Sequence, residues 1–176
     1  MSKDHNHLRN IILAGLLASM SIVLKIFLSF TTYELRISFY EIPLFIGGIV
    51  LGPFLAGIAG FAVDWTYVMV HPFAFTFNLF TLSAMLWGIV PGLVFLKRKV
   101  TMSKIAFTII GLSLLTFILN SVQLYIFSGP GMFAQVPARL LIMGLKWPIQ
   151  IPVIYIIYEK AVKPTFQMIF AQNQRY

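Results

Sequence analysis

Two charged side chains lie deep inside apolar stretches of this sequence, where an ionised group is costly. Asp64 falls about ten residues into the stretch 54–70, and Lys146 about nine residues into the stretch 137–158. A buried charge needs a partner or a polar cavity. Two interpretations therefore stay open for Asp64: an ion pair with Lys146, or direct binding of a ligand.

Arg36 and Arg139 stand near the ends of such stretches, where each guanidinium could hold a carboxylate through two parallel hydrogen bonds. The alternative is that each caps a helix or contacts lipid headgroups. Aromatic and amide or hydroxyl side chains accompany these charges, as a small-molecule pocket requires, although a belt of interfacial aromatics would look similar. We predict a ligand site formed by Arg36, Phe39, Asp64, Tyr67, Phe77, Asn78, Thr81, Asn120, Arg139 and Lys146.

The motifs of several enzyme classes are missing from the sequence. It has no Gly-x-x-x-x-Gly-Lys-Ser/Thr loop for nucleotide phosphates, no His-Glu-x-x-His and no Gly-x-Ser-x-Gly. The chain has no cysteine, and its three histidines are placed in a tail and a loop, so no metal site is predicted. We expect a protein that is not an enzyme and uses no cofactor itself.

The elements that must position these residues are apolar helices. Apolar residues make up 59% of the 176 residues, charged residues only 10%, and the mean hydropathy is +0.89. Soluble domains carry roughly 25% charged residues, and a membrane span needs about 20 apolar ones. We predict an all-α integral membrane bundle of six transmembrane helices, one domain over 1–176 with tails of about 1–7 and 164–176. The apolar stretches are 8–30, 42–51, 54–70, 78–96, 105–127 and 137–158.

Basic residues indicate the orientation of these spans. Nine of the 13 lie before or at the start of the first stretch, after the fourth or after the sixth. Six spans place all three groups on one side, and the positive-inside rule makes that side, with both termini, cytoplasmic. The net charge of +8 is thereby explained without nucleic acid.

Small residues recur at helical spacing, which lets helix backbones approach closely. Ala14 and Ala18 lie in the first stretch, and Gly48, Gly52, Ala56 and Gly60 run across the second and third, where Gly52-Pro53 predicts a break. Internal packing is the simpler interpretation of such spacing.

Several motifs together resemble the substrate-binding S components of energy-coupling factor (ECF) vitamin transporters, most of all the folate branch, over nearly the whole chain. They are Ala14-Gly-Leu-Leu-Ala18, Leu35-Arg-Ile-Ser-Phe39 with Ile42-Pro43, Gly52-Pro53 with Gly57, Gly60 and Asp64, Phe80-Thr-Leu-Ser-Ala84 with Gly88, and Ala138-Arg-Leu140 with Pro148-Ile-Gln150. The stretch Phe77-Asn-Leu-Phe80 and the pair Lys146-Trp147 depart from the folate pattern.

The resemblance implies a high-affinity vitamin-binding subunit, folate being the expected ligand, in a bacterial cell membrane. Its partners would be a transmembrane scaffold subunit, contacted through Ala14 and Ala18, and two ATPase subunits that use ATP while this chain reorients. An S component for pantothenate, pyridoxine or hydroxymethylpyrimidine remains an alternative, as does a stand-alone secondary transporter.

Overall fold

The fold, a computed structural model, is described for residues 2–32, 35–70, 79–96 and 99–164. Six α-helices follow one another: α1 (Ser2–Ile26), α2 (Glu41–Leu51), α3 (Pro53–Val70), α4 (Leu79–Val94), α5 (Met102–Ser128) and α6 (Val136–Ile157). Shorter elements connect or extend them: strands β1 (Phe30–Thr32) and β2 (Leu35–Ile37), a 3-10 segment η1 (Gly129–Gln135) and a π-helical turn η2 (Tyr158–Val162). These helices overlap the six predicted stretches, although α1 begins at Ser2, within the predicted tail, and ends at Ile26.

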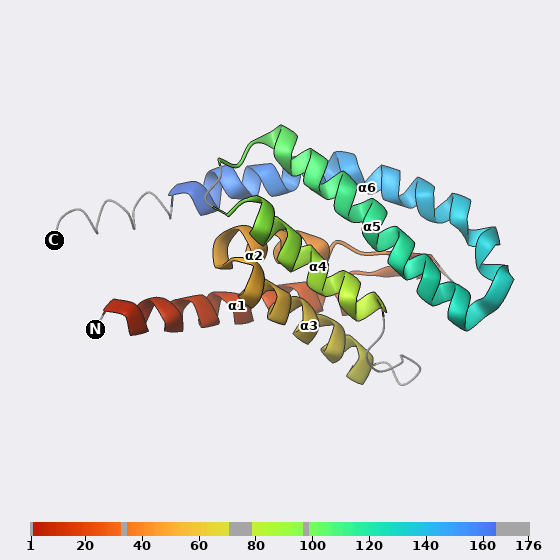
Figure 1. Cartoon of the computed structure of the whole chain (residues 1–176), viewed down its shortest axis with the longest axis horizontal. Helices are drawn as coiled ribbons and strands as arrows, with labels where there is room; N and C mark the ends of the chain where they lie inside the picture. Colours follow the sequence, from red (N-terminus) through yellow and green to blue (C-terminus); the bar gives the residue numbers. More distant parts are fainter. Residues whose placement is uncertain (1, 33–34, 71–78, 97–98, 165–176) are drawn as a thin grey trace.

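The helices alternate in direction along one long axis (Figure 1). Helices α1, α3 and α5 run one way, and α2, α4 and α6 return. The beginning of α1 and the turn η2 therefore lie at the same end, which we call the terminal end. The opposite end, where α1 passes into the strands, we call the hairpin end.

The strands at the hairpin end were not predicted and qualify the all-α fold class. They pair antiparallel, with Phe30 opposite Ile37, Thr31 opposite Arg36 and Thr32 opposite Leu35. Three residues per strand are too few to show the period of two by which strands are recognised.

The predicted break between α2 and α3 is confirmed. Helix α2 ends at Leu51, and Gly52 follows at φ +84°, a left-handed conformation that glycine adopts without steric cost. Its N–H donates to the carbonyl of Gly48 at 3.1 Å, and Pro53 then starts α3 with the φ that proline imposes.

Glycines bring α2, α3 and α4 into backbone contact. A Cβ added at Gly48 would collide with the carbonyl of Gly88 on α4, and one added at Gly60 would lie 2.5 Å from the carbonyl oxygen of Ala84. For these two residues the interpretation as internal packing is confirmed. Beside them, Phe45 is fully buried, its ring centroid 6.5 Å from that of Trp87 and 6.0 Å from that of Phe95.

The outside of the bundle is apolar, as expected for a protein surrounded by lipid. Helix α1 exposes Leu8, Leu16 and Met20, and α5 exposes Phe107 and Ile118. Three helical segments in the described part of the chain are long and apolar enough to cross a membrane: His7–Ile26, Pro53–Val70, and Met102–Val162, which contains both α5 and α6. Helices α2 and α4 are apolar but shorter.

Candidate functional site

Buried polar side chains gather in the half of the bundle toward the hairpin end. They lie late in α1, α3 and α5 and early in α2 and α4: Lys25, Glu41, Asp64, Thr81, Ser83 and Gln123. Because the helices alternate in direction, these positions fall in the same half (Figure 1). The other half is packed by apolar residues such as Phe95, Ile105 and Ile109. The half toward the hairpin end is therefore the candidate region for polar recognition among the described residues.

The first polar group, the Asp64 cluster, joins α1, α3 and α4. The Lys25 ammonium contacts Oδ1 of Asp64, and the Thr81 hydroxyl donates to Oδ2 at 2.5 Å. The rings of Tyr40 and Tyr67 lie 4.7 and 5.2 Å from the Lys25 nitrogen, where a cation interacts favourably with an aromatic face. The cluster pairs a buried carboxylate with a buried ammonium, which lowers the cost of keeping both ionised.

Of the two interpretations left open for Asp64, the ion pair with Lys146 is wrong. Asp64 is matched by Lys25 and Lys146 by Glu41. Equal depth along two spans made the pair plausible, but α3 contacts α1, α2 and α4, whereas α6 contacts α2 and α5. The alternative, that Asp64 binds ligand, stays a prediction.

The second polar group, the Glu41 cluster, joins α2 and α6. The Lys146 ammonium donates to Oε1 of Glu41 at 2.6 Å, and the Gln150 amide donates to Oε2 at 3.3 Å. Lys146 lies four residues before Gln150, so both side chains leave the same face of α6. The Phe39 ring centroid is 5.8 Å from the Lys146 nitrogen.

Solvent exposure distinguishes the two clusters. The side chains of Lys25 and Asp64 are 6% and 3% exposed, whereas those of Lys146 and Glu41 are 16% and 9% exposed. The carboxylate of Asp64 is held on both oxygens, whereas among the described side chains Oε2 of Glu41 has only the long contact to Gln150. The Glu41 cluster is therefore the more accessible of the two to a ligand.

The two clusters are neighbours, because three consecutive residues serve both. Phe39 and Glu41 contact Lys146, and Tyr40 between them contacts Lys25. A ligand at the Glu41 cluster would thus lie next to the Asp64 cluster.

A third set of polar contacts joins α4, α5 and α6. Ser83 donates to the amide oxygen of Asn120 at 2.7 Å, which places predicted residue Asn120 within the same half. Arg139 donates to the Ser121 hydroxyl at 3.1 Å, and its guanidinium carbon is 5.0 Å from the Phe117 ring centroid. Arg139 is half-buried between α5 and α6, and its predicted grip on a ligand carboxylate stays a prediction.

The remaining predicted residues are distributed as follows. Phe77 and Asn78 lie outside the described residues, and Arg36 lies in β2 with its side chain outside the described part. Ala18 is buried in the chain's own core, whereas Ala14 is half-buried. The predicted contact of these two alanines with a partner subunit stays a prediction.

Lys25, Glu41 and Gln150 were missed as site residues. A signal was present in the sequence, since Lys25 and Glu41 are charges next to or within apolar stretches and were left without a role. Their partners could not be paired without knowing which helices are neighbours. In the described part of the chain, no three acidic, histidine or cysteine side chains stand together as a metal site would require.

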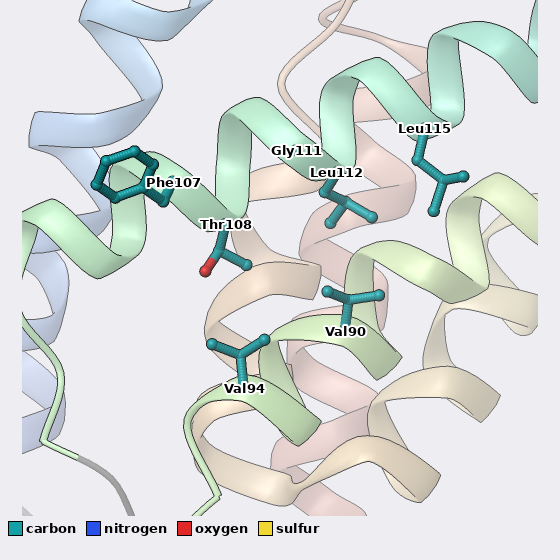
Figure 2. A pocket seen from close by; sticks show the side chains of 7 residues that line it. All are labelled: Val90, Val94, Phe107, Thr108, Gly111, Leu112 and Leu115. Carbon is teal, nitrogen blue, oxygen red and sulfur yellow. The ribbon is translucent and has the colours of Figure 1, made fainter.

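An apolar groove of about 300 Å³ lies between α4 and α5 (Figure 2). Its lining residues are Val90, Val94, Phe107, Thr108, Gly111, Leu112 and Leu115. Thr108 supplies the sole side-chain polar atom, and that hydroxyl donates to the Lys104 carbonyl at 2.7 Å. The groove therefore lacks the polar groups that a water-soluble ligand requires.

Comparisons with known proteins match almost the whole chain. Residues 9–169 match the family described as ECF transporter, substrate-specific component. The folate transporter FolT of Clostridium novyi (strain NT) is 33% identical over 138 residues, which are 78% of this chain and 80% of that protein. The crystal structure of FolT bound with folic acid superposes with a TM-score of 0.78 at 30% identity, covering 86% of this chain and 93% of the other.

Proposed function

This chain belongs to the ECF transporter substrate-specific components, and from that premise we propose that it binds folate for import across a bacterial cell membrane. Two relatives support folate as the ligand: one is a folate transporter, and the other was crystallised with folic acid. At 30–33% identity the ligand can still differ, so pantothenate, pyridoxine or hydroxymethylpyrimidine is the alternative that the experiment must exclude.

The proposal includes six membrane spans with both termini in the cytoplasm. Helices in alternating directions support six crossings, although α2 and α4 are short. Lys99 precedes α5 and Lys104 lies in its first turn, whereas Lys160 lies in η2 and Lys163 directly follows it. These segments are at the terminal end (Figure 1). By the positive-inside rule that end is cytoplasmic, so the half with the buried polar clusters faces outward, toward the incoming vitamin.

The observation that carries the proposal is the largely buried Glu41 cluster next to Phe39. The pterin ring of folate presents an amino group and a ring N–H side by side, next to a carbonyl oxygen. A carboxylate can accept two parallel hydrogen bonds from such an edge, and Lys146 or Gln150 can donate to the carbonyl. Phe39 would stack on the ring, and Arg36 and Arg139 would hold the glutamate carboxylates. Lys146 keeps Glu41 neutralised while the site is empty.

Calorimetry on the purified chain tests the ligand, with folate, pantothenate and pyridoxine compared under the same conditions. Tight binding of folate alone is expected. Binding of pantothenate or pyridoxine without folate would refute the proposal.

Glu41→Gln tests the site, since it removes the charge while keeping the shape. Loss of a charge-assisted hydrogen bond in a desolvated site costs about 1.5–3 kcal/mol, roughly ten- to a hundredfold in affinity. The matched control is Glu159→Gln, because Glu159 pairs with Lys163 at the opposite end of the molecule. Equal folate affinity of Glu41→Gln and Glu159→Gln would show that the pterin lies elsewhere.

Transport itself requires partners in this proposal. The sequence has no phosphate-binding loop, and the family name describes a component of a larger transporter. We propose that a scaffold subunit and two ATPases supply the energy, and that this chain uses no cofactor and reorients in the membrane to release the vitamin. Uptake by cells that express this chain without any ECF partner would instead favour a stand-alone secondary transporter.

A further inference from the structure

The groove between α4 and α5 lies in the half of the bundle away from the polar clusters. Val90 and Val94 of α4 face Leu112 and Leu115 of α5 across it (Figure 2). A Cβ added at Gly111 would meet nothing within 4 Å, so the missing side chain leaves open space in the groove. The groove is thus an apolar depression on the outside of the bundle.

A positive charge stands at one end of this groove. Lys104, Thr108, Gly111 and Leu115 follow one another at intervals of four, three and four residues, so they form one stripe along α5. Lys104 is exposed and begins that stripe at the terminal end. Its ammonium donates to the carbonyl of Lys99, a second exposed lysine, at 3.3 Å. Lys104 is therefore a cationic residue one helical turn beyond Thr108, at the terminal side of the apolar groove.

The length of the groove and the chemistry of its lining match an acyl chain with an anionic headgroup. From Thr108 to Leu115 the stripe rises about 10 Å at roughly 1.5 Å per residue, which fits within one leaflet of a hydrocarbon core about 30 Å thick. An acyl chain fills such a depression without unpaired polar groups, and a phosphate at the level of the loop would meet Lys104. A vitamin would leave its polar groups unpaired here.

We propose that this groove binds an anionic phospholipid, with one acyl chain against Gly111 and Leu112 and the phosphate on Lys104. The site is separate from the Glu41 cluster and does not depend on folate as the vitamin. A lysine near the membrane surface favours an anionic lipid by roughly fivefold, and Lys99 adds a similar factor. The lipid is therefore retained in preference to zwitterionic neighbours.

Native mass spectrometry of the full chain, with phosphatidylglycerol and phosphatidylcholine of identical acyl chains, tests the proposal. The unaltered chain should retain one phosphatidylglycerol molecule at least fivefold more than phosphatidylcholine. Lys104→Gln should lower that preference by about fivefold, whereas the control Lys163→Gln, at the end of α6, should not. Equal retention of both lipids by the unaltered chain would overturn the proposal.

Variants that fill the groove with a larger side chain test the lipid site independently of charge. Gly111→Leu should reduce retention of both lipids, and the control is Gly144→Leu on α6, where an added Cβ also meets nothing within 4 Å. Should Gly111→Leu fold poorly, Gly111→Val, a smaller addition to the same space, should still reduce retention. Unchanged lipid retention together with lost association with a scaffold subunit would overturn the proposal and identify the groove as a protein interface.

Discussion

Replacing Lys25 by methionine tests whether the Asp64 cluster holds the bundle together or binds the ligand. The change leaves the 3% exposed carboxylate of Asp64 with Thr81 but without its counter-ion. Removing one partner of a buried ion pair costs about 3–5 kcal/mol, because the remaining charge stays buried and unpaired. For a chain of this size that corresponds to a drop of roughly 6–20 °C in melting temperature.

The double variant Lys25→Met with Asp64→Asn supplies the decisive comparison. It removes both charges, so most of the lost stability should return, to within about 1 kcal/mol of the unaltered chain. Thermal unfolding of the ligand-free protein in detergent, followed by tryptophan fluorescence, measures both variants. Lys163→Met is the control, since its pair with Glu159 is exposed to solvent and should contribute little to stability.

Ligand affinity of the same variants separates the two roles. If the cluster is structural, folate affinity per folded molecule should change by less than about threefold. A stable Lys25→Met protein whose folate affinity falls tenfold or more would refute the structural reasoning and assign the cluster to the ligand. That outcome would support the prediction that Asp64 itself contacts the vitamin.

Three further predictions follow from packing and contacts. Gly60→Ala should lower the melting temperature, since overpacking costs about 1–3 kcal/mol. Gly111→Ala should leave the melting temperature unchanged or raise it. A lower melting temperature for Gly111→Ala than for Gly60→Ala would contradict the packing argument. Ala18→Trp should lower the melting temperature, because Ala18 is buried in the core. Ala14→Trp should keep its folate affinity but lose uptake and co-purification with the scaffold subunit. Normal uptake by Ala14→Trp would show that Ala14 does not belong to the docking surface. Arg139→Gln should weaken folate binding in calorimetry but not binding of a pterin without the glutamate; equal losses would show that Arg139 only joins α5 to α6.

The helices were predictable from sequence because each depends on a continuous apolar stretch. The break after Leu51 was predictable too, because glycine and proline act locally on the backbone. The partners of buried charges were not, because depth along a span does not determine which spans are neighbours. Lys25 and Glu41 were visible as unexplained charges, yet only the packing of α1 on α3 and of α2 near α6 assigns their partners. The types of residue in the candidate site were therefore predictable from the sequence, but the ion pairs that they form were not.

The glycines divide the molecule into parts of unequal stiffness. Those at Gly48, Gly60 and Gly88 bring backbone against backbone, so α2, α3 and α4 have no flexible side chains between them at these points to absorb a displacement. Those at Gly111 and Gly144, on α5 and α6, have no neighbour that an added Cβ would touch. The ion pair from Glu41 to Lys146 spans the boundary between these parts, since it joins α2 to α6. A tilt of α6 relative to the glycine-packed helices would therefore change the distance between these two charges, while the contact between Asp64 and Thr81, made within the stiff part, would keep its length.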